Sequence, residues 1–507
     1  MAKEYDVIIA GGGLTGLTAG WVLNGKGKRV LLLEARDRLG GRTYTVERSY
    51  QGNPTWFDLG AHFIGDEEFQ FDVWDLVAQL SLDVFPQYEG PATTPPIPPN
   101  WDGLAADLLA TQQGAQAFIG TMVPETEEGQ YFLGLLVKMT SDFPLAAPQD
   151  YPDAAALDAV SVWDWILAQK APNGKPAPQE TLAALQMLCL VGFSAEPQQI
   201  NMLWFLFYLA SSGGLERFQV VRWPVQGAQG FRLVYGAQSI SETLAEGITF
   251  PDEDSVRTGV RVAAVRASGN GVRVTTDDGE EFVGRTFLAA MAPRLSQLID
   301  YDPPLPPARV AAANAMENGD IIMTYVTFSR PFWREDTTRY PNGTVNGQPT
   351  ENISRWGLSG NVLFLDGPVV WMMDNSTYEG QAALFAFICG DAARKLGAQP
   401  LEVRRKTVLQ QMQLVFGDDV GACFQDYNEQ NWNAEIYSKG CPAAHFTPGT
   451  FLSSINQVLL SQMPPDAFGR VFFASTEAAE LSNGYMSGAV WAGKKVAENI
   501  LSVLGTR

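Results

Sequence analysis

The sequence predicts a mixed α/β fold with two domains, and three observations carry this prediction. The chain has 507 residues, 46% of them hydrophobic, which is enough for two sizeable cores. An apolar strand pattern at residues 5–10 leads into a glycine turn and then a helix pattern, as in Rossmann-like units. Further strand and helix patterns alternate to the end of the chain, so we expect one domain to be discontinuous in sequence.

The glycine turn has a spacing that suits a dinucleotide. Gly11 would make the tight turn, Gly13 would let the backbone approach a pyrophosphate, and Gly16 would let the helix pack against the strand. The helix that begins near Leu14 would direct its first N–H groups at the phosphates. Glu34 ends the second predicted strand, where a carboxylate can accept hydrogen bonds from ribose hydroxyls.

The charge of the chain limits its partners. Its 56 acidic and 35 basic residues give a formal net charge of −21 and a pI near 4.5. Binding to nucleic acid or to an anionic membrane surface needs basic patches, so we expect neither partner. An acidic field can attract cationic substrates such as amines, although solubility is the simpler explanation of the charge.

The cysteines and apolar runs indicate a soluble, cytoplasmic protein. The four cysteines are widely spaced and form no CxxC pair, so we expect no disulfide framework and no metal site. The chain leads directly into a strand, so we expect no secretory signal. The apolar run at residues 202–210 is shorter than the roughly 18 residues that a membrane span needs.

The secondary structure predicted for the middle of the chain changes from loop to helix and then to strand. A proline-rich stretch at residues 91–99 predicts a loop or linker, because proline is excluded from helix interiors. Residues 101–215 are helix-like, with long stretches free of glycine and proline. Residues 256–288 read as strands, and Asp277-Asp278-Gly279-Glu280 predicts a hairpin turn between two of them.

The last part of the chain supplies a second glycine-containing turn. Another strand begins near Ile321, and residues 470–474 form a final strand pattern that ends shortly before Glu477. Gly484 then precedes a helix pattern whose first N–H groups would lie near an electron-rich ring carbonyl. Such a helix start would favour an electron-rich or anionic group.

The residues after Glu34 narrow the type of dinucleotide. Residues 35–42 add glycines for close backbone approach and arginines that can meet phosphate bidentately. This extension resembles the FAD-binding fingerprint of flavin-containing amine oxidases. With the C-terminal turn, it makes the chain similar to that family, and to monoamine oxidases in particular, over almost its whole length. Further similar segments lie at residues 204–208, 331–334, 431–441 and 448–449.

The resemblance implies a GR2-type FAD-binding domain in three pieces with an inserted substrate domain of mixed helices and sheet. The FAD-binding domain would contain residues 1–84, 234–312 and 435–507, and the substrate domain residues 85–233 and 313–434. The residues that the resemblance assigns to the cofactor are Gly11, Gly13, Gly16, Glu34, Arg36, Gly41, Arg42, Gly60, Ala61, Val260, Trp432, Cys441, Glu477, Tyr485 and Met486.

The resemblance also implies a reaction. In the family, a neutral amine loses a hydride from its α-carbon to flavin N5, water hydrolyses the imine to an aldehyde, and O₂ reoxidises the flavin with release of H₂O₂. We therefore expect an FAD-dependent amine oxidase whose partners are a small-molecule amine and O₂. Gln229 resembles a glutamine that lines the substrate cavity, and Tyr485 resembles one wall of the aromatic cage that aligns the amine.

Several candidate catalytic positions depart from the family pattern. Met323 stands where the family has a lysine that holds a water at flavin N5 and assists reaction with O₂. Pro442 replaces the second tyrosine of the cage, and residues 481–483 lack a tryptophan usually found there. The two histidines, His62 and His445, fall in segments that face the flavin in the family, and either could shuttle protons near neutral pH. His62 also resembles a histidine that touches substrate in polyamine oxidases.

Two questions stay open at the level of sequence. Cys441 stands where monoamine oxidases attach FAD through a thioether, yet it also reads as a small residue beside noncovalently bound flavin, which we prefer. Met323 and Pro442 would also suit a flavin-dependent isomerase or desaturase of an apolar substrate that reacts poorly with O₂. A flavoprotein scaffold used only for binding is a third hypothesis, and a homodimer is left open.

Overall fold

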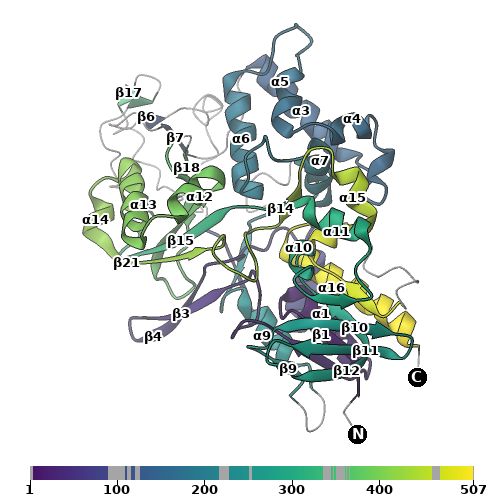
Figure 1. Cartoon of the computed structure of the whole chain (residues 1–507). Helices are drawn as coiled ribbons and strands as arrows, with labels where there is room; N and C mark the ends of the chain where they lie inside the picture. The colour runs from purple at the N-terminus through teal and green to yellow at the C-terminus, as the bar shows by residue number, and fades with distance from the viewer. Residues whose placement is uncertain are drawn as a thin grey trace.

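The described part of the chain forms two large sheets and a layer of helices (Figure 1). The computed structural model describes residues 4–88, 109–110, 116–119, 126–215, 228–249, 254–334, 344–345, 348–349, 360, 362–364, 366–458 and 469–505. The predicted loop at residues 91–99 lies outside these residues. Strands and helices alternate along the chain, so the predicted mixed α/β fold is confirmed.

The first sheet is built around the N-terminal strand. β1 (Glu4–Ala10) lies between β12 (Glu281–Ala289) and β2 (Val30–Leu33) and runs parallel to both. Its last four residues are buried, as expected for a central parallel strand that is covered on both faces. The predicted hairpin is confirmed, because β11 (Gly271–Thr276) pairs antiparallel with β12. The other strands are β9 (Val256–Arg257), β10 (Val262–Ser268), β13 (Asp300–Asp302) and β23 (Val471–Phe473), and the strand order is β13-β10-β11-β12-β1-β2-β9 with β23 beside β12.

Two helices from opposite ends of the chain pack together against this sheet. α1 (Leu14–Gly25) follows the glycine turn, and α16 (Met486–Leu504) is the final helix (Figure 1). The two helices come close because Gly493 has no side chain, and a Cβ there would lie 2.6 Å from the Thr15 carbonyl oxygen. Next to this pair lie α2 (Phe71–Gln79), which contacts α16, and α9 (Gln238–Glu246), which contacts α1.

The second sheet is antiparallel between its named central strands. β15 (Ile321–Phe328), predicted from the sequence to begin near Ile321, pairs with β20 (Ala382–Cys389) and with β21 (Phe424–Asn431). The other strands are β19 (Val369–Asp374), β18 (Val362–Phe364), β7 (Gln116–Ile119) and β6 (Leu109–Ala110), in the order β21-β15-β20-β19-β18-β7-β6. The helices on this side of the molecule are α12 (Gly390–Gly397), α13 (Leu401–Phe416) and α14 (Asp419–Cys423) (Figure 1).

The helical prediction for residues 101–215 is wrong near its start. Residues 116–119 form β7, in which Phe118 pairs with Leu363 of β18. Strand pairing of this kind depends on a distant partner, so it overrides the local pattern. From residue 127 the prediction is confirmed by α3 (Glu127–Ser141), α4 (Ala154–Asp158), α5 (Val162–Ala168), α6 (Gln179–Phe193) and α7 (Met202–Ser211).

The helical layer has its own apolar core. α7 contains the apolar run noted in the sequence, and nine of its ten residues are buried against the neighbouring helices. α11 (Pro307–Asn314) and α15 (Phe451–Val458) contribute to the same core. None of the helices in the described part of the chain is long and apolar enough to cross a membrane.

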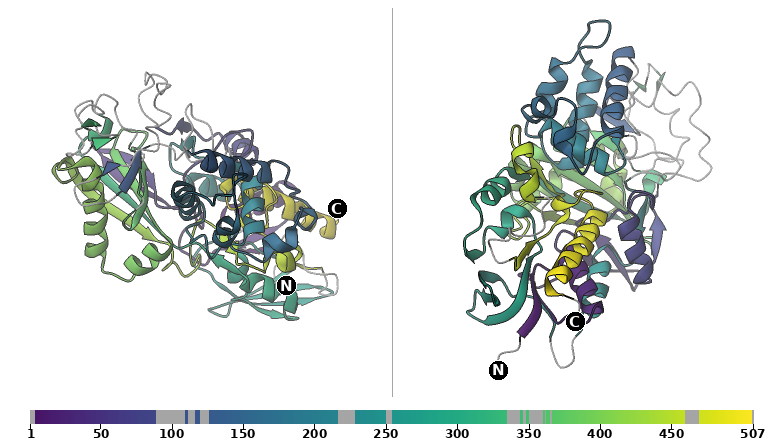
Figure 2. Two further views of the ribbon diagram at one scale, coloured as in Figure 1. Left: turned by 90° about the horizontal axis from the view of Figure 1, so that it is seen from above. Right: turned by 90° about the vertical axis from the view of Figure 1, so that its right-hand side faces the viewer.

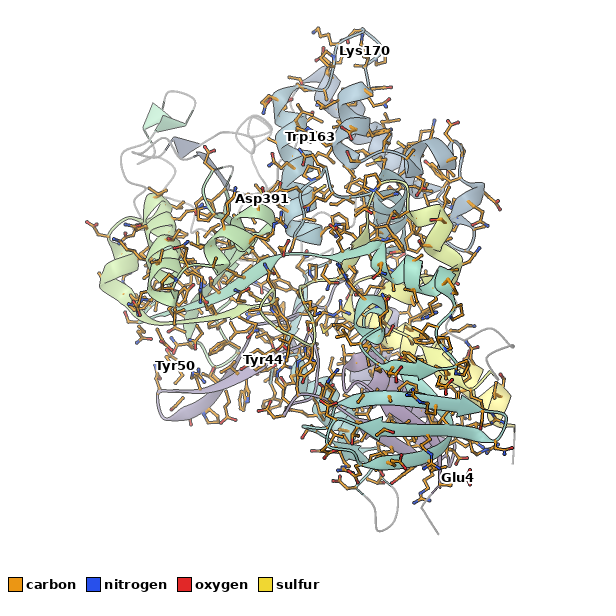
Figure 3. All side chains as sticks on the ribbon, viewed as in Figure 1. Glu4, Tyr44, Tyr50, Trp163, Lys170 and Asp391 are labelled. Carbon is orange, nitrogen blue, oxygen red and sulfur yellow. The ribbon has the colours of Figure 1, made fainter. Side chains whose placement is uncertain are left out.

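Short strand pairs connect these layers. They are β3 (Thr45–Tyr50) with β4 (Asn53–Asp58), β5 (Val84–Pro86) with β8 (Phe231–Leu233), β14 (Met316–Asn318) with β22 (Ala444–Phe446), and β16 (Thr344–Val345) with β17 (Gln348–Pro349). The β3–β4 ribbon projects from the molecule, with Tyr44 at its base and Tyr50 near its tip (Figure 3). The short helix α10 (Pro293–Ser296) follows β12.

Each of the two large sheets takes its strands from the sequence segments of one predicted domain. Every strand of the first sheet comes from residues 1–84, 234–312 or 435–507, and every strand of the second from residues 85–233 or 313–434. Figure 2 shows the two sheets apart from each other in further views, with helices between them. The β14–β22 pair joins segments of both groups, and the domain boundaries stay a prediction.

Candidate functional site

A cavity lies where the two sheets and the helical layer meet. The residues predicted for the site line it, except Gly16, Glu477 and His445. These residues come from parts of the chain that are hundreds of positions apart, and the fold brings them together. The predicted residues along its wall are Gly11, Gly13, Glu34, Arg36, Gly41, Arg42, Gly60, Ala61, His62, Gln229, Val260, Met323, Trp432, Cys441, Tyr485 and Met486.

The glycine turn is built in a way that only glycine permits. Gly11 has a φ of +113°, and a Cβ there would lie 2.3 Å from the Ala290 carbonyl oxygen. A Cβ on Gly16 would lie 2.1 Å from the Gly11 carbonyl oxygen, so Gly16 shapes the turn from behind without lining the cavity. A Cβ on Gly13 would meet no protein atom closer than 3.9 Å, which leaves its cavity side open to a ligand.

Glu34 is held at the end of β2 by backbone donors. Its carboxylate accepts hydrogen bonds from the N–H groups of Gly12 (2.6 Å) and Arg36 (2.9 Å). Beside it, the Arg36 guanidinium donates to Ser438 Oγ (2.8 Å) and lies over the ring of Tyr437. Tyr437 and Ser438 also line the cavity. This end therefore offers a fixed carboxylate, an arginine and an aromatic face, which suit an adenosine and its ribose.

Two helix N-termini point their free N–H groups at the same cavity. α1 begins after Gly13 and α16 begins after Tyr485, and neither has a side-chain cap or an acidic residue in its first turn. The residues around both starts line the cavity. Uncapped N–H groups and positive dipole ends favour anions or electron-rich atoms. The donor set thus fits a pyrophosphate near α1 and an electron-rich ring near α16, as in FAD.

Arg42 and Glu477 form an ion pair behind the cavity wall. Arg42 donates to both carboxylate oxygens of Glu477, at 2.6 and 3.2 Å, and to the Pro442 carbonyl oxygen at 2.9 Å. Burial alone would raise the pKa of Glu477, but the charge and hydrogen bonds of Arg42 outweigh it and hold that pKa below its usual range. Glu477 is not among the described residues that line the cavity, whereas its partner Arg42 is.

The other end of the cavity is aromatic. Met323 of β15, Phe387 of β20 and Trp371 of β19 lie directly opposite one another across three neighbouring strands, and all three line the cavity. The rings of Trp371 and Phe387 pack edge to face with centroids 5.2 Å apart, and Phe63 lies 6.2 Å from Trp371. Met323 is 2% exposed, so the place of the expected cation is an apolar wall.

Two hydrogen-bond acceptors interrupt this apolar wall. His62 Nδ1 lies 3.0 Å from the Gly60 carbonyl oxygen, which can only accept, so Nδ1 carries the proton and Nε2 is an acceptor. His62 Nε2 and Gln229 Oε1 are both buried and have no partner among the described residues. Burial lowers the pKa of His62 to about 3, so the side chain is neutral at physiological pH and is not the near-neutral proton shuttle expected from the sequence.

Tyr485 has an aromatic partner that the sequence did not reveal. Its ring lies 5.9 Å from that of Tyr208 in α7, at an interplanar angle of 34°, and the two hydroxyls are hydrogen-bonded. A Cβ on Gly484 would lie 2.7 Å from the Tyr208 ring, so glycine makes room for that ring. Both tyrosines line the cavity, and burial raises the pKa of each, so both hydroxyls stay protonated.

Cys441 and His445 differ in their relation to the cavity. Cys441 lines it, and burial raises the pKa of its thiol to about 12. His445 is buried in β22 near Trp204 and is absent from the cavity wall that the structure describes, so the expectation that both histidines face the cofactor is wrong for His445. Burial lowers the pKa of His445 to about 4.

Sequence reasoning missed most of the aromatic wall. Phe63 adjoins the predicted His62, so a wider reading of that motif would have found it. Tyr208 lies in a family-like segment but had no assigned role. Trp371 and Phe387 sit inside continuous apolar strands, where the sequence gives no sign of which side chains face a cavity.

Comparison with known proteins agrees with this geometry. The model of the flavin containing amine oxidoreductase family matches residues 14–501. Amine oxidase [flavin-containing] B of Cavia porcellus is 28% identical over 510 residues, which cover 100% of this chain and 88% of that protein. The probable flavin-containing monoamine oxidase A of Dictyostelium discoideum is 27% identical, and the match covers 99% of this chain and 98% of that protein.

A solved structure shares the fold. Cyclohexylamine oxidase from Brevibacterium oxydans IH-35A superposes with a TM-score of 0.81 at 24% identity. The superposition covers 99% of this chain and 100% of that protein. The sequence match spans nearly the whole chain, and the donor set of the cavity fits FAD at both of its ends. The chain therefore belongs to the flavin-containing amine oxidoreductase family and is an FAD-dependent oxidoreductase.

Proposed function

We propose that this protein oxidises a primary or secondary amine with an apolar or aromatic body to the imine, which water hydrolyses to an aldehyde. The observation that carries the proposal is a pair of acceptors, His62 Nε2 and Gln229 Oε1, that have no partner in the described part of the chain and lie at the aromatic end of the cavity. Two acceptors without a donor suit the N–H groups of a substrate amine. The aromatic wall of Trp371 and Phe387 suits its apolar body.

The neutral form of the amine is the one that this cavity favours. Glu34 is the single carboxylate among the described residues that line the cavity, and it lies at the nucleotide end. An ammonium ion at the aromatic end would lose its hydration without gaining a counter-ion there, which is costly. His62 is neutral and accepts a hydrogen bond, so it can orient an amine N–H. Tyr208 and Tyr485 give that region an aromatic pair with fixed hydroxyls.

FAD would be held along the wall by the residues that fit its parts. Gly11, Gly13 and the start of α1 would hold the pyrophosphate, and Glu34 the ribose. Arg42 would help to hold the ADP half, and the start of α16 would face the flavin end. When bound, FAD supplies a two-electron acceptor for the hydride of the amine α-carbon. The chain contributes orientation and exclusion of water.

The direct test is a panel of amines with aliphatic, cyclic and aromatic bodies, together with a diamine. We expect anaerobic bleaching of the flavin by monoamines with apolar bodies, and H₂O₂ release when air is admitted. The diamine should react poorly because its second ammonium finds no carboxylate among the described residues of the aromatic end. Silence across the whole panel would contradict the proposal.

A second candidate is favoured by Met323. Met323, Phe387 and Trp371 lie side by side and line the cavity, and these three side chains bring no cation to it and no N–H or O–H donor except the indole of Trp371. This candidate is a flavin-dependent isomerase or desaturase of an apolar substrate that reacts poorly with O₂. Mixing photoreduced enzyme with aerated buffer separates the two: fast reoxidation supports the oxidase, and slow reoxidation that Met323→Lys accelerates supports the alternative.

We also propose that the reaction takes place in the cytoplasm. The four cysteines are free and buried, which suits a reducing compartment. Fractionation of the source cells followed by a flavin and activity assay tests this location.

A further inference from the structure

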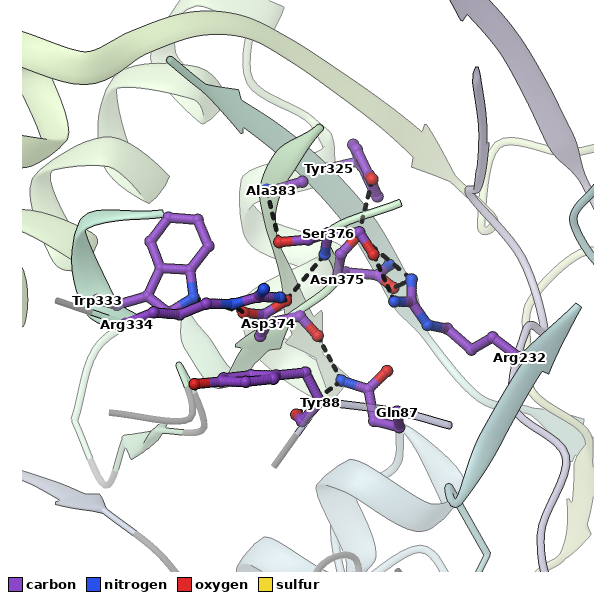
Figure 4. Close-up of polar contacts among 10 residues, drawn as sticks. All are labelled: Gln87, Tyr88, Arg232, Tyr325, Trp333, Arg334, Asp374, Asn375, Ser376 and Ala383. Carbon is purple, nitrogen blue, oxygen red and sulfur yellow. Dashed lines mark hydrogen bonds and ion pairs between the residues drawn. The ribbon is translucent and has the colours of Figure 1, made fainter. Parts of the chain in front are cut away.

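Arg232 is a buried cation close to the cavity but outside its wall. It lies in β8, three residues after Gln229, and is 6% exposed. Its guanidinium donates to the backbone carbonyls of Asn375 and Ser376 and to the side-chain oxygen of Asn375 (Figure 4). It also lies over the ring of Phe85, with its central carbon 4.6 Å from the ring centroid.

The partners of Arg232 are unusual for a buried arginine. All its described hydrogen bonds go to neutral oxygen atoms, and the carboxylates of Asp58 and Asp374 act on it only through their electrostatic field. Burial lowers the pKa of Arg232, because the charged form has lost its hydration. A buried charge held by neutral partners adds little stability compared with an apolar side chain. Stability therefore does not explain Arg232, and we look for its role in the geometry of its hydrogen bonds.

The turn that Arg232 grips is fixed from its other side as well. Asp374 accepts hydrogen bonds from Trp333 Nε1 (2.6 Å) and from Arg334 Nε (2.6 Å) and Nη2 (2.8 Å). The Tyr325 hydroxyl donates to the Asn375 carbonyl oxygen at 2.8 Å. Figure 4 shows these groups converging on residues 374–376 from β15 and the segment after it. The turn between β19 and β20 is therefore a rigid point.

Arg232 joins β8 to the turn at residues 374–376, and we call this contact the junction. The segments on its two sides carry opposite walls of the cavity. β19 and β20 leave the turn and carry Trp371 and Phe387. β8 follows Gln229 directly and pairs with β5, where Gln87 just beyond the pairing donates to the Asp374 carbonyl oxygen at 2.6 Å. The Phe231 N–H donates to the Ile64 carbonyl oxygen, which ties β8 to the segment of His62.

We propose that Arg232 is a positioning residue that sets Gln229 and His62 at a fixed distance from the aromatic wall of Trp371 and Phe387. The planar guanidinium fork bonds two successive carbonyl groups and a side-chain oxygen through two separate nitrogens that are held in one fixed geometry. The inference rests on the proposed function, because it treats the aromatic end of the cavity as the substrate site. The substrate dimension that it controls is the width between the acceptor pair and the aromatic rings.

The first test measures how firmly residues 228–236 are held, without any substrate. Hydrogen exchange in peptides that cover residues 228–236 is compared in the FAD-loaded wild type, Arg232→Met and Arg232→Lys. We expect at least tenfold faster exchange in both variants, since a single ammonium cannot replace the fork. Arg404→Met is the control, because Arg404 is a half-buried arginine, bonded to Glu429, that lies outside the described cavity wall. Unchanged exchange in Arg232→Met overturns the proposal.

The second test is a double-mutant cycle with Gln229. The readout is the benzylamine concentration that half-saturates anaerobic flavin reduction, measured in variants with full FAD content. We expect Arg232→Met and Gln229→Ala each to raise it about tenfold, and the double variant to exceed either single one by less than twofold. Effects that multiply in full overturn the positioning role, whereas a residue that acts only on stability would leave the half-saturation unchanged. If benzylamine does not reduce the wild-type flavin, the proposed function is what fails, and the exchange experiment still decides whether Arg232 orders β8.

Discussion

The two ends of the cavity hold their ligands by different physical means. At the nucleotide end the contacts are backbone N–H groups, a glycine turn with no room for a side chain, and charges that are already paired, such as Arg42 with Glu477. At the aromatic end they are ring faces and two acceptors, His62 Nε2 and Gln229 Oε1, that have no partner among the described residues. The first end is specified by close backbone geometry, and the second by the shape of a surface and a few lone pairs.

This contrast indicates what each end can tolerate. A backbone cradle fails as soon as a single atom is added, because nothing around it can move. An apolar surface accepts changes of shape and loses affinity gradually. The nucleotide end therefore keeps one cofactor, whereas the aromatic end is where related chains can diverge in substrate.

The largest effect should come from adding one carbon to the glycine turn. In Gly16→Ala the new Cβ would lie 2.1 Å from the Gly11 carbonyl oxygen, so the turn must open and FAD should be lost. The matched control is Gly25→Ala at the end of the same helix, where a Cβ meets no atom within 4 Å. Flavin absorbance per polypeptide after gel filtration measures the outcome, and a yellow Gly16→Ala protein would show that the turn is not a rigid cradle.

The next effect should come from breaking the charge pair that supports the nucleotide end. Arg42→Met leaves the Glu477 carboxylate buried with no cation, and removal of one partner of a buried pair costs about 3 kcal/mol or more. The double variant Arg42→Met with Glu477→Gln should recover part of this loss, because it removes the unpaired charge. Urea unfolding at pH 7 measures the three free energies. Equal values for the single and the double variant would contradict the pairing argument.

A smaller and different effect is expected at the aromatic end. His62→Asn should keep its FAD and raise the half-saturating amine concentration roughly tenfold, the equivalent of one lost hydrogen bond of about 1.4 kcal/mol. Because the pKa of His62 is lowered to about 3, the variant should leave the pH profile of flavin reduction unchanged between pH 6 and 9. Stopped-flow reduction across this range gives both values, and a shifted profile would restore His62 as a proton carrier.

The smallest effect concerns the pH dependence of stability at His445. Burial lowers the pKa of His445 to about 4 in the folded chain, below the ordinary value of 6.5. Between these two pH values the unfolded chain binds the extra proton, so the free energy of unfolding falls as the pH falls. At pH 5.5 this costs about 1.4 kcal/mol for one histidine. His445→Leu should therefore lose less stability than the wild type between pH 7.5 and 5.5, with FAD content unchanged. Thermal unfolding at both pH values checks this, and parallel losses would exclude His445 as the cause.

The sequence alone determined the cofactor end of this protein. Gly11, Gly13, Gly16 and Glu34 lie within one strand–turn–helix–strand unit, so their contacts are local and their spacing is visible in the chain. The second glycine turn before α16 was found in the same way. Resemblance added the distant members, and the structure collects all but Gly16 and Glu477 on one cavity wall.

The tertiary structure decided the substrate end. Met323, Phe387 and Trp371 share one face because three antiparallel strands align them, and a register shift of one residue would turn each side chain away. The burial of His62 depends on Phe385 of β20, and the partner of Tyr485 comes from α7. Register, burial and the grip of Arg232 on residues 375 and 376 arise only when distant segments pack, so no local pattern in the chain encodes them.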